Sequence, residues 1–162
     1  MSNRVIGSCL LAVSLLFVGD RPVAAQSGVS VSGSYDFYYH EFDETSAAGA
    51  HFDVAKSLGM VDVVGEIGFN HFDGGTPVSY QGGLRYNFAT GMGGGSAKPF
   101  VQFLLGGWSC CDVNEFLIQP GVGVDIATGK GFDIRVAYDF RTIFFDPSEN
   151  AHRVSAGVVK RF

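Results

Sequence analysis

The chain has 162 residues, a formal net charge of −5, 23 glycines and an aromatic content of 14%. An acidic, glycine-rich and aromatic-rich chain is a poor candidate for binding nucleic acid, whose phosphates attract basic surfaces. Beyond the N-terminal segment, no stretch approaches the roughly eighteen consecutive apolar residues that a helical membrane span requires.

The N-terminal segment predicts a secretory signal peptide. Arg4 supplies a positive charge, and the stretch from Val5 to Val18 is apolar but too short to span a bilayer. Val23-Ala24-Ala25 places small residues at the usual cleavage spacing. We therefore expect residues 1–25 to be removed as a signal peptide and residues 26–162 to form one domain.

Apolar and polar residues then alternate with a period of two, in segments of about ten residues separated by Gly, Pro, Asn and Asp clusters. This length suits a tilted transmembrane strand better than the shorter strands of soluble sheets. Pro120 interrupts one segment and predicts a bulge there, because proline cannot donate to a sheet ladder. We expect eight strands, at residues 29–39, 50–57, 61–70, 78–87, 100–108, 116–126, 132–141 and 154–162.

The two faces of these strands differ in a way that predicts an inverted protein. One face carries charges near strand centres, which a small soluble core rarely buries. The other places Tyr, Phe and Trp mainly near strand ends and Val, Ile, Leu and Gly near the middles, which is the girdle pattern of lipid-exposed barrels. We therefore expect an all-β fold, a closed eight-stranded antiparallel up-and-down transmembrane β-barrel with an apolar exterior and a polar interior. A secreted lipocalin-like barrel shares the strand number, but its outer face would be polar.

The inward charges are expected to form a paired network that fills the barrel interior. A hairpin about Gly74-Gly75 would place Glu66 nearly opposite Arg85, and a turn near Pro147 would bring Asp139 to Arg153. The expected members of the network are Asp53, Glu66, Arg85, Asp125, Arg135, Asp139 and Arg153.

The chain ends in an apolar strand whose last residue is the aromatic Phe162. This ending resembles the C-terminal strand of bacterial outer-membrane β-barrels, whose final Phe is read by the assembly machinery. Residues 98–107 (KPFVQFLLGG) and 120–125 (PGVGVD) are also similar to the small outer-membrane β-barrel family, which includes the transmembrane domain of OmpA, OmpX and the opacity proteins. The resemblance covers essentially the whole mature chain.

The resemblance implies a location in the outer membrane with both termini in the periplasm. The implied partners are outer-membrane lipid and lipopolysaccharide, the barrel-assembly machinery and periplasmic chaperones, with Phe162 as the assembly signal. Residues 58–59, 89–97 and 128–131 would then connect strands at the periplasmic end. Four acidic loops would face outward, at residues 41–48, 73–77, 109–115 and 142–151.

The sequence carries no recognisable catalytic motif, and we predict no catalytic, cofactor-binding or metal-binding residue. The four histidines, His40, His51, His71 and His152, fall near the outward rim but lack tight ligand spacing. Cys110 and Cys111 are adjacent in an exported chain, where a bond between them or pairing with another molecule both remain open.

The function expected from these features is non-enzymatic. We expect a structural role, or adhesion through the short outward loops to the surface ligand or host molecule that such a role requires. The alternatives are an outer-membrane lipid-modifying enzyme and a soluble periplasmic lipocalin-like binding barrel.

Overall fold

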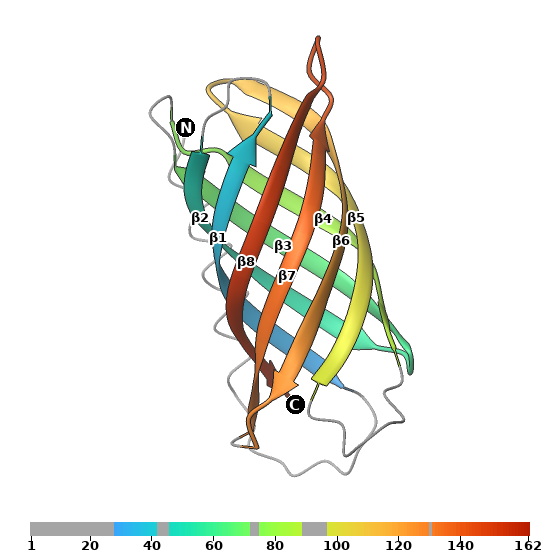
Figure 1. Ribbon diagram of the computed structural model, residues 1–162. Helices are drawn as coiled ribbons and strands as arrows, with labels where there is room; N and C mark the ends of the chain where they lie inside the picture. The colour runs from blue at the N-terminus through green and yellow to red at the C-terminus, as the bar shows by residue number, and fades with distance from the viewer. Residues whose placement is uncertain (1–27, 42–45, 72–74, 89–96, 130) are drawn as a thin grey trace, which may run out of the picture.

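The computed structural model describes residues 28–41, 46–71, 75–88, 97–129 and 131–162, so the expected signal peptide lies outside the described residues. Each strand pairs antiparallel with the next, and β1 pairs with β8 to close the barrel (Figure 1). Within these residues, no helix is long and apolar enough to cross a membrane. The expected fold class is confirmed. The eight strands are β1 (Val29–His40), β2 (Ser46–Ser57), β3 (Val61–His71), β4 (Val78–Asn87), β5 (Ala97–Cys110), β6 (Val113–Ala127), β7 (Phe132–Ile143) and β8 (Glu149–Arg161).

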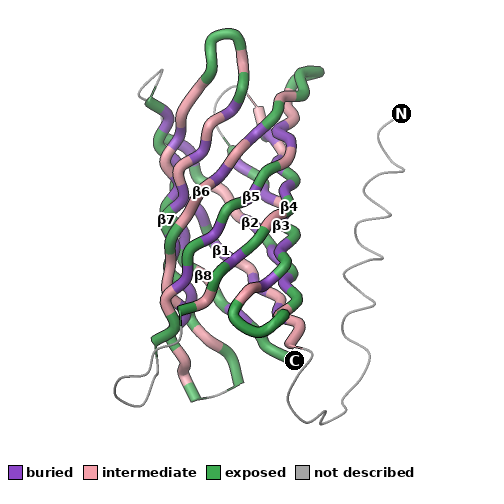
Figure 2. The backbone as a smooth tube through the Cα atoms, turned by 90° about the vertical axis from the view of Figure 1, so that its right-hand side faces the viewer, coloured by how far each residue is buried: buried purple, intermediate pink, exposed green. Residues whose placement is uncertain are grey.

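Burial alternates along each strand, because successive side chains of a strand point to opposite faces of the sheet. In β1, Asp36 and Tyr38 are fully buried while Tyr35 and Phe37 are exposed. Figure 2 shows this alternation as buried and exposed segments that follow one another along the strands. The largest fully buried side chains include three arginines, Arg85, Arg141 and Arg153. The interior is therefore polar, as the strand pattern predicts.

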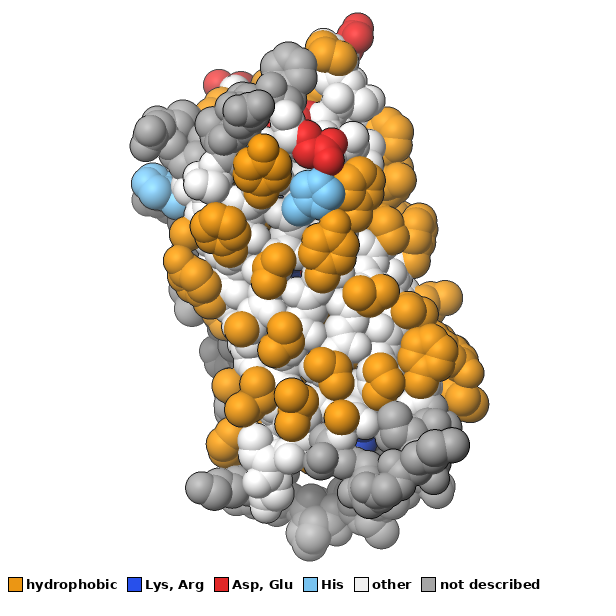
Figure 3. Space-filling view, viewed as in Figure 1, with side chains coloured by type: hydrophobic (Ala, Val, Ile, Leu, Met, Phe, Trp, Pro, Cys, Tyr) orange, Lys and Arg blue, Asp and Glu red, His pale blue; other side chains and the backbone are white. Residues whose placement is uncertain are grey.

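The exterior is covered with apolar side chains, which Figure 3 shows spread over the visible face of the barrel. We call the end of the barrel that holds Val29 and Phe162 the inner end and the opposite end the outer end. Tyr86 and Phe88 lie near the inner end, while Phe116 and Phe144 lie near the outer end. Trp108 departs from the expected girdle, since it is only 9% exposed. Its ring lies inside the barrel, where it packs with Leu117 and Ile143 and contacts Phe145 edge-to-face at 5.1 Å between centroids.

The outward hairpins are longer and their loops shorter than expected. β5 and β6 pair as far as Cys110 and Val113, so the predicted loop at 109–115 is a two-residue turn at Cys111 and Asp112. Both turn residues have positive φ, 55° and 68°, as a type I′ hairpin turn requires. β2 likewise begins at Ser46, inside the expected loop at 41–48, and β8 begins at Glu149, inside the expected loop at 142–151.

The bulge expected at Pro120 does not form. On either side of it, Ile118 pairs with Thr142 and Gly121 pairs with Asp139, which is one continuous register without an inserted residue. Pro120 keeps its place opposite Phe103 on β5. The described ladder between β6 and β7 lapses at positions 119 and 120 and resumes unchanged, so the missing proline N–H interrupts the pairing without shifting the strand.

Candidate functional site: interior charge network and outer rim

The inner half of the barrel interior is organised around Arg135. Its Nε and Nη2 donate to the two oxygens of Asp125 at 2.7 and 2.9 Å, and its Nη1 donates to Asp53 Oδ2 at 2.9 Å. Arg85 Nη1 lies 3.5 Å from the other oxygen of Asp53. Arg161 closes the inner end by donating to Asp125 and to Asp133. Arg85 and Arg135 therefore balance the charges of Asp53 and Asp125.

The outer half is organised around Arg153, which is fully buried. Its Nη1 and Nη2 donate to the two oxygens of Glu66 at 2.7 and 3.0 Å, and its Nε donates to Asp139 Oδ2 at 2.9 Å. A two-pronged contact of this kind satisfies guanidinium and carboxylate together. His51 lies beside the same group, with Nδ1 2.7 Å from Asp36 Oδ1 and Nε2 3.9 Å from Glu66.

Gln102 joins the two halves of the network. Its Oε1 accepts from Arg85 Nε and Nη2 at 3.1 and 2.9 Å, and its Nε2 donates to Asp139 Oδ1 at 2.8 Å. Gly121 makes this bridge possible, because a Cβ at that position would overlap Asp139 and crowd the Gln102 side chain. The interior is thus one connected network of hydrogen bonds and ion pairs, in which the 3.5 Å contact of Arg85 with Asp53 is an ion pair without a hydrogen bond.

The seven side chains predicted for the network are all buried, but one predicted pairing is wrong. Asp139 and Arg153 are register partners and form an ion pair at 2.7 Å. Glu66 does not pair with Arg85, because the β3–β4 register places Gln81 opposite Glu66 and Asp62 opposite Arg85. A turn at Gly74-Gly75 would place position 83 opposite Glu66, so the actual register differs from the assumed one by two residues, which moves Arg85 away from Glu66 and into the layer of Asp53.

Five buried titratable side chains of the interior were missing from the predicted network: Asp36, His40, His51, Asp62 and Arg141. All five lie on the polar face of their strands, which was the signal available in the sequence. Arg141 lies over the ring of Tyr38, 5.2 Å from its centroid. Among the described residues, Arg141 Nε and Nη2 have no hydrogen-bond partner. In Arg153, by contrast, all three guanidinium nitrogens donate hydrogen bonds.

The four histidines do not come together. His40 and His51 point inward, where Nδ1 of His40 lies 2.6 Å from Glu149. His71 is exposed beside Thr76, and His152 lies on the face of β8 that forms the exterior wall of the barrel. Among the described residues, no three His, Cys, Asp or Glu side chains are grouped so that they could hold a metal ion.

His152 is part of a polar chain on the outside of the barrel, near its outer rim. Its Nδ1 lies 2.6 Å from the Tyr138 hydroxyl and its Nε2 lies 2.7 Å from Glu41 Oε1. The contact with His152 lowers the pKa of the Glu41 carboxyl below its usual value. The rings of Tyr39 and Phe140 flank the imidazole. Figure 3 shows a histidine directly beneath acidic side chains at the upper edge of the apolar surface.

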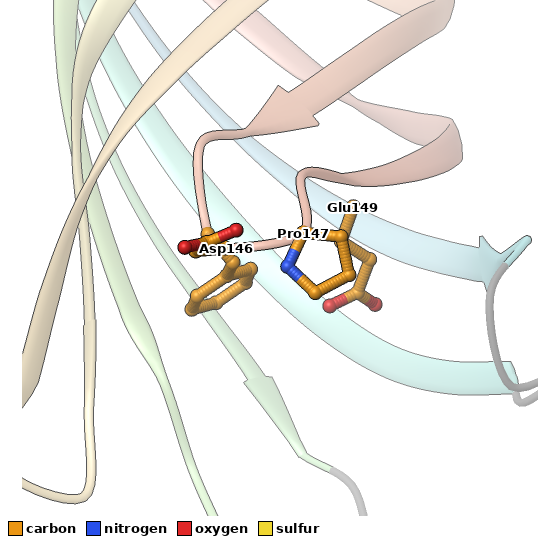
Figure 4. A pocket seen from close by; sticks show the side chains of 4 residues that line it. Asp146, Pro147 and Glu149 are labelled. Atoms are coloured by element: carbon orange, nitrogen blue, oxygen red, sulfur yellow. The ribbon is translucent and has the colours of Figure 1, made fainter.

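A small pocket lies at the β7–β8 hairpin (Figure 4). It has a volume of about 200 Å³ and is lined by Phe145, Asp146, Pro147 and Glu149. Pockets that enclose drug-sized ligands usually measure about 300–1,000 Å³. The pocket is therefore suited at most to one small group at the mouth of the barrel.

Phe162 lies at the opposite end, where the last strand meets the first. Its backbone N–H donates to Val29 O at 2.9 Å, and its side chain is 60% exposed. Lys160 Nζ lies 6.0 Å from the ring centroid, within reach of a cation–π contact. The ring therefore projects from the barrel beside the seam between β1 and β8.

Deleting Phe162 is expected to slow assembly without unfolding the barrel. The burial lost is worth about 2–3 kcal/mol, which is small for a closed barrel. We expect less barrel inserted in the membrane of cells but near-normal folding of purified chain into detergent, measured by heat-modifiable gel mobility. Lys160→Ala, which keeps the terminal aromatic, is the control. Equal membrane levels of wild type and the deletion would rule out Phe162 as the assembly signal.

Comparison with known proteins shows the fold. No protein-family model matches the sequence, and no curated protein matches it either. Neisserial surface protein A matches 83% of this chain with 96% of its own length, at 12% identity and a TM-score of 0.60. Ail, the attachment invasion locus protein of Yersinia pestis, matches 85% of this chain with 100% of its own length, at 12% identity and a TM-score of 0.59.

The outer-membrane enzyme PagL matches 80% of this chain with 98% of its own length, at 16% identity and a TM-score of 0.53. Proteins with different roles thus share this architecture, so the similarity establishes the fold and leaves activity to the site. The closed eight-stranded sheet, its apolar exterior and these neighbours together give the chain the fold of the small outer-membrane β-barrels.

Proposed function

We propose that this protein is a non-enzymatic barrel of the bacterial outer membrane that acts at the cell surface by attachment. The observation that carries the location is the inverted arrangement of side chains, with exposed apolar groups around the sheet and paired charges inside it. A closed barrel leaves no unpaired strand edge in lipid. Its partners in the membrane are lipid and lipopolysaccharide, and its route there uses the barrel-assembly machinery and periplasmic chaperones.

The filled interior favours a role at the surface over transport. Eight strands leave a lumen that side chains can fill, and the described interior is crossed by the network from Arg161 to Arg153. What remains for interaction is the outward end, where the β5–β6 and β7–β8 hairpins carry exposed Val113, Phe116 and Phe144. The similar folds of a neisserial surface protein and of an attachment invasion locus protein support this assignment.

The test is a loop exchange in cells. Phe144, Asp146 and Pro147 are replaced by Gly or Ser, and Phe145 is kept because its ring packs against Trp108. Bacteria carrying wild type or variant are compared for binding to cultured epithelial cells. We expect binding to fall several-fold while outer-membrane level and heat-modifiable mobility stay the same, because the hairpin tip lies outside the barrel sheet. Unchanged binding by the variant and by a strain lacking the protein would contradict the proposal.

One observation favours a second candidate, a lipid-modifying enzyme. The chain Glu41–His152–Tyr138 places a carboxylate, an imidazole and a phenol in sequence on the lipid-facing side, and orientation of a base by a third group is a general feature of activated nucleophiles. The fold of PagL shows that this architecture can carry an enzyme. Mass spectrometry of lipid A from the same strains separates the candidates: a difference that disappears in Tyr138→Phe would establish the enzyme.

A further inference from the structure

The outermost turn of the β5–β6 hairpin brings two sulfur atoms together. Cys110 is the last residue of β5, and Cys111 is the first of the two turn residues. Their Sγ atoms lie 2.6 Å apart. Cys111 is exposed and Cys110 is half-buried, so the pair is reachable from outside the barrel. Adjacent residues do not normally direct their side chains at each other along a strand, and the turn is what allows it.

The backbone of this turn is held in an uncommon conformation. Cys111 and Asp112 both have φ in the left-handed region, where residues other than glycine are uncommon. Gly75 lies next to the pair. A Cβ added to it would lie 3.2 Å from Cys110 Sγ and 3.3 Å from Cys111 Sγ, so the space beside both sulfurs is too tight for a side chain at this position. The turn therefore places the thiols side by side, and Gly75 leaves room for them.

We propose that Cys110 and Cys111 form a reversible dithiol–disulfide couple at the outer tip of the barrel, with the disulfide of a thiol oxidant as the co-reactant. A disulfide between adjacent cysteines closes an eight-membered ring on an exposed turn. Strained or exposed disulfides have higher reduction potentials and are the labile, regulatory ones. The couple is thus a switch of the hairpin tip rather than a structural cross-link, since no other segment is tied by it.

The reaction balances as a thiol–disulfide exchange in two steps. The Cys111 thiolate attacks the oxidant R–S–S–R, which forms the Cys111–S–S–R mixed disulfide and releases R–S⁻. The Cys110 thiolate then attacks Cys111 Sγ, forms the ring and releases the second R–S⁻, while the two thiol protons pass to solvent or to the leaving thiolates. The two cysteines lose two electrons and the oxidant gains them.

The order of attack follows from the geometry. The hydrogen bond to Cys111 raises the pKa of the Cys110 thiol to about 11, and the thiolate is the nucleophile in exchange. The more exposed Cys111 therefore reacts first. Once Cys111 is in the mixed disulfide its thiol no longer makes this hydrogen bond, and Cys110 becomes the resolving residue.

The experiment uses the barrel without residues 1–25, which removes Cys9 and leaves Cys110 and Cys111 as its only cysteines. The protein is placed in detergent, reduced with a phosphine and then exposed to oxidised glutathione. Free thiols are labelled with a maleimide after denaturation, and the products are weighed by mass spectrometry. We expect a monomer that has lost two hydrogens, takes up no label and carries no glutathione. Cys110→Ser should instead keep one glutathione on Cys111, because the resolving thiol is gone.

Two controls accompany this experiment. The double variant Cys110→Ser/Cys111→Ser should be inert, and all variants should show the same heat-modifiable mobility, since the pair lies at the tip of the hairpin, where Cys110 is the last paired residue of β5. A wild type that keeps two labelled thiols, carries two glutathiones or forms a disulfide-linked dimer would overturn the proposal. Reoxidised monomer that returns to two labelled thiols on mild reduction would establish that the couple is reversible.

Discussion

Replacing Arg153 with methionine is expected to lower the free energy of unfolding by about 3–5 kcal/mol, because it leaves buried carboxylates without their cation. Arg153 is fully buried and contacts both Glu66 and Asp139 at 2.7 Å. Methionine keeps much of the side-chain length while removing the charge. The measurement is urea unfolding in lipid vesicles, followed by intrinsic fluorescence and by gel mobility.

Two further variants serve as the control and as a partial rescue. Arg161→Met removes an arginine whose side chain is 37% exposed at the inner rim, where an ion pair is worth about 0–1 kcal/mol. Adding Glu66→Gln to Arg153→Met should recover part of the lost stability, because it removes one stranded charge. Equal stability of Arg153→Met and Arg161→Met would mean that water, rather than Arg153, satisfies the carboxylates of the outer half.

The period of two was sufficient to predict most of the fold. It separates Asp139 and Arg153 from Tyr138 and Val154, and the short β7–β8 connection then brings the two charges together. The face that meets lipid could also be predicted, because charges near strand centres exclude the opposite assignment. These inferences are local, since each depends on residues within one strand or one hairpin.

What the sequence could not provide was the register across longer connections. Alternation is preserved when a strand slips by two or four residues, so the β3–β4 pairing of Glu66 had no local signal that could correct it. The contacts of Arg153 with Glu66 and of Arg135 with Asp53 cross the barrel interior, and they depend on strand tilt as well as on order. Trp108 was assigned outward from its residue type, although its even-numbered position on β5 is shared with buried Phe100 and Leu104.

The second large effect is expected on the outside of the barrel, at Val136. This residue is 42% exposed and lies four positions from both Phe132 and Phe140, midway between the two aromatic ends of β7. Its register partners, Val124 and Ala156, are apolar as well. Val136→Arg is therefore expected to lower the free energy of unfolding by about 2–4 kcal/mol in lipid vesicles, the cost of a cation near the bilayer midplane.

The control for Val136 is Val113, which has the same exposed fraction, 42%, but lies at the outward end of β6. Val113→Arg should cost only about 0–1 kcal/mol, because the penalty falls toward the interface. Val136→Leu should be silent and shows whether the site tolerates a change of shape. If Val136→Arg cost no more than Val113→Arg, the middle of β7 would not lie in hydrocarbon. Because exposure is matched, a difference between the two arginines reports depth in the membrane rather than burial in the protein.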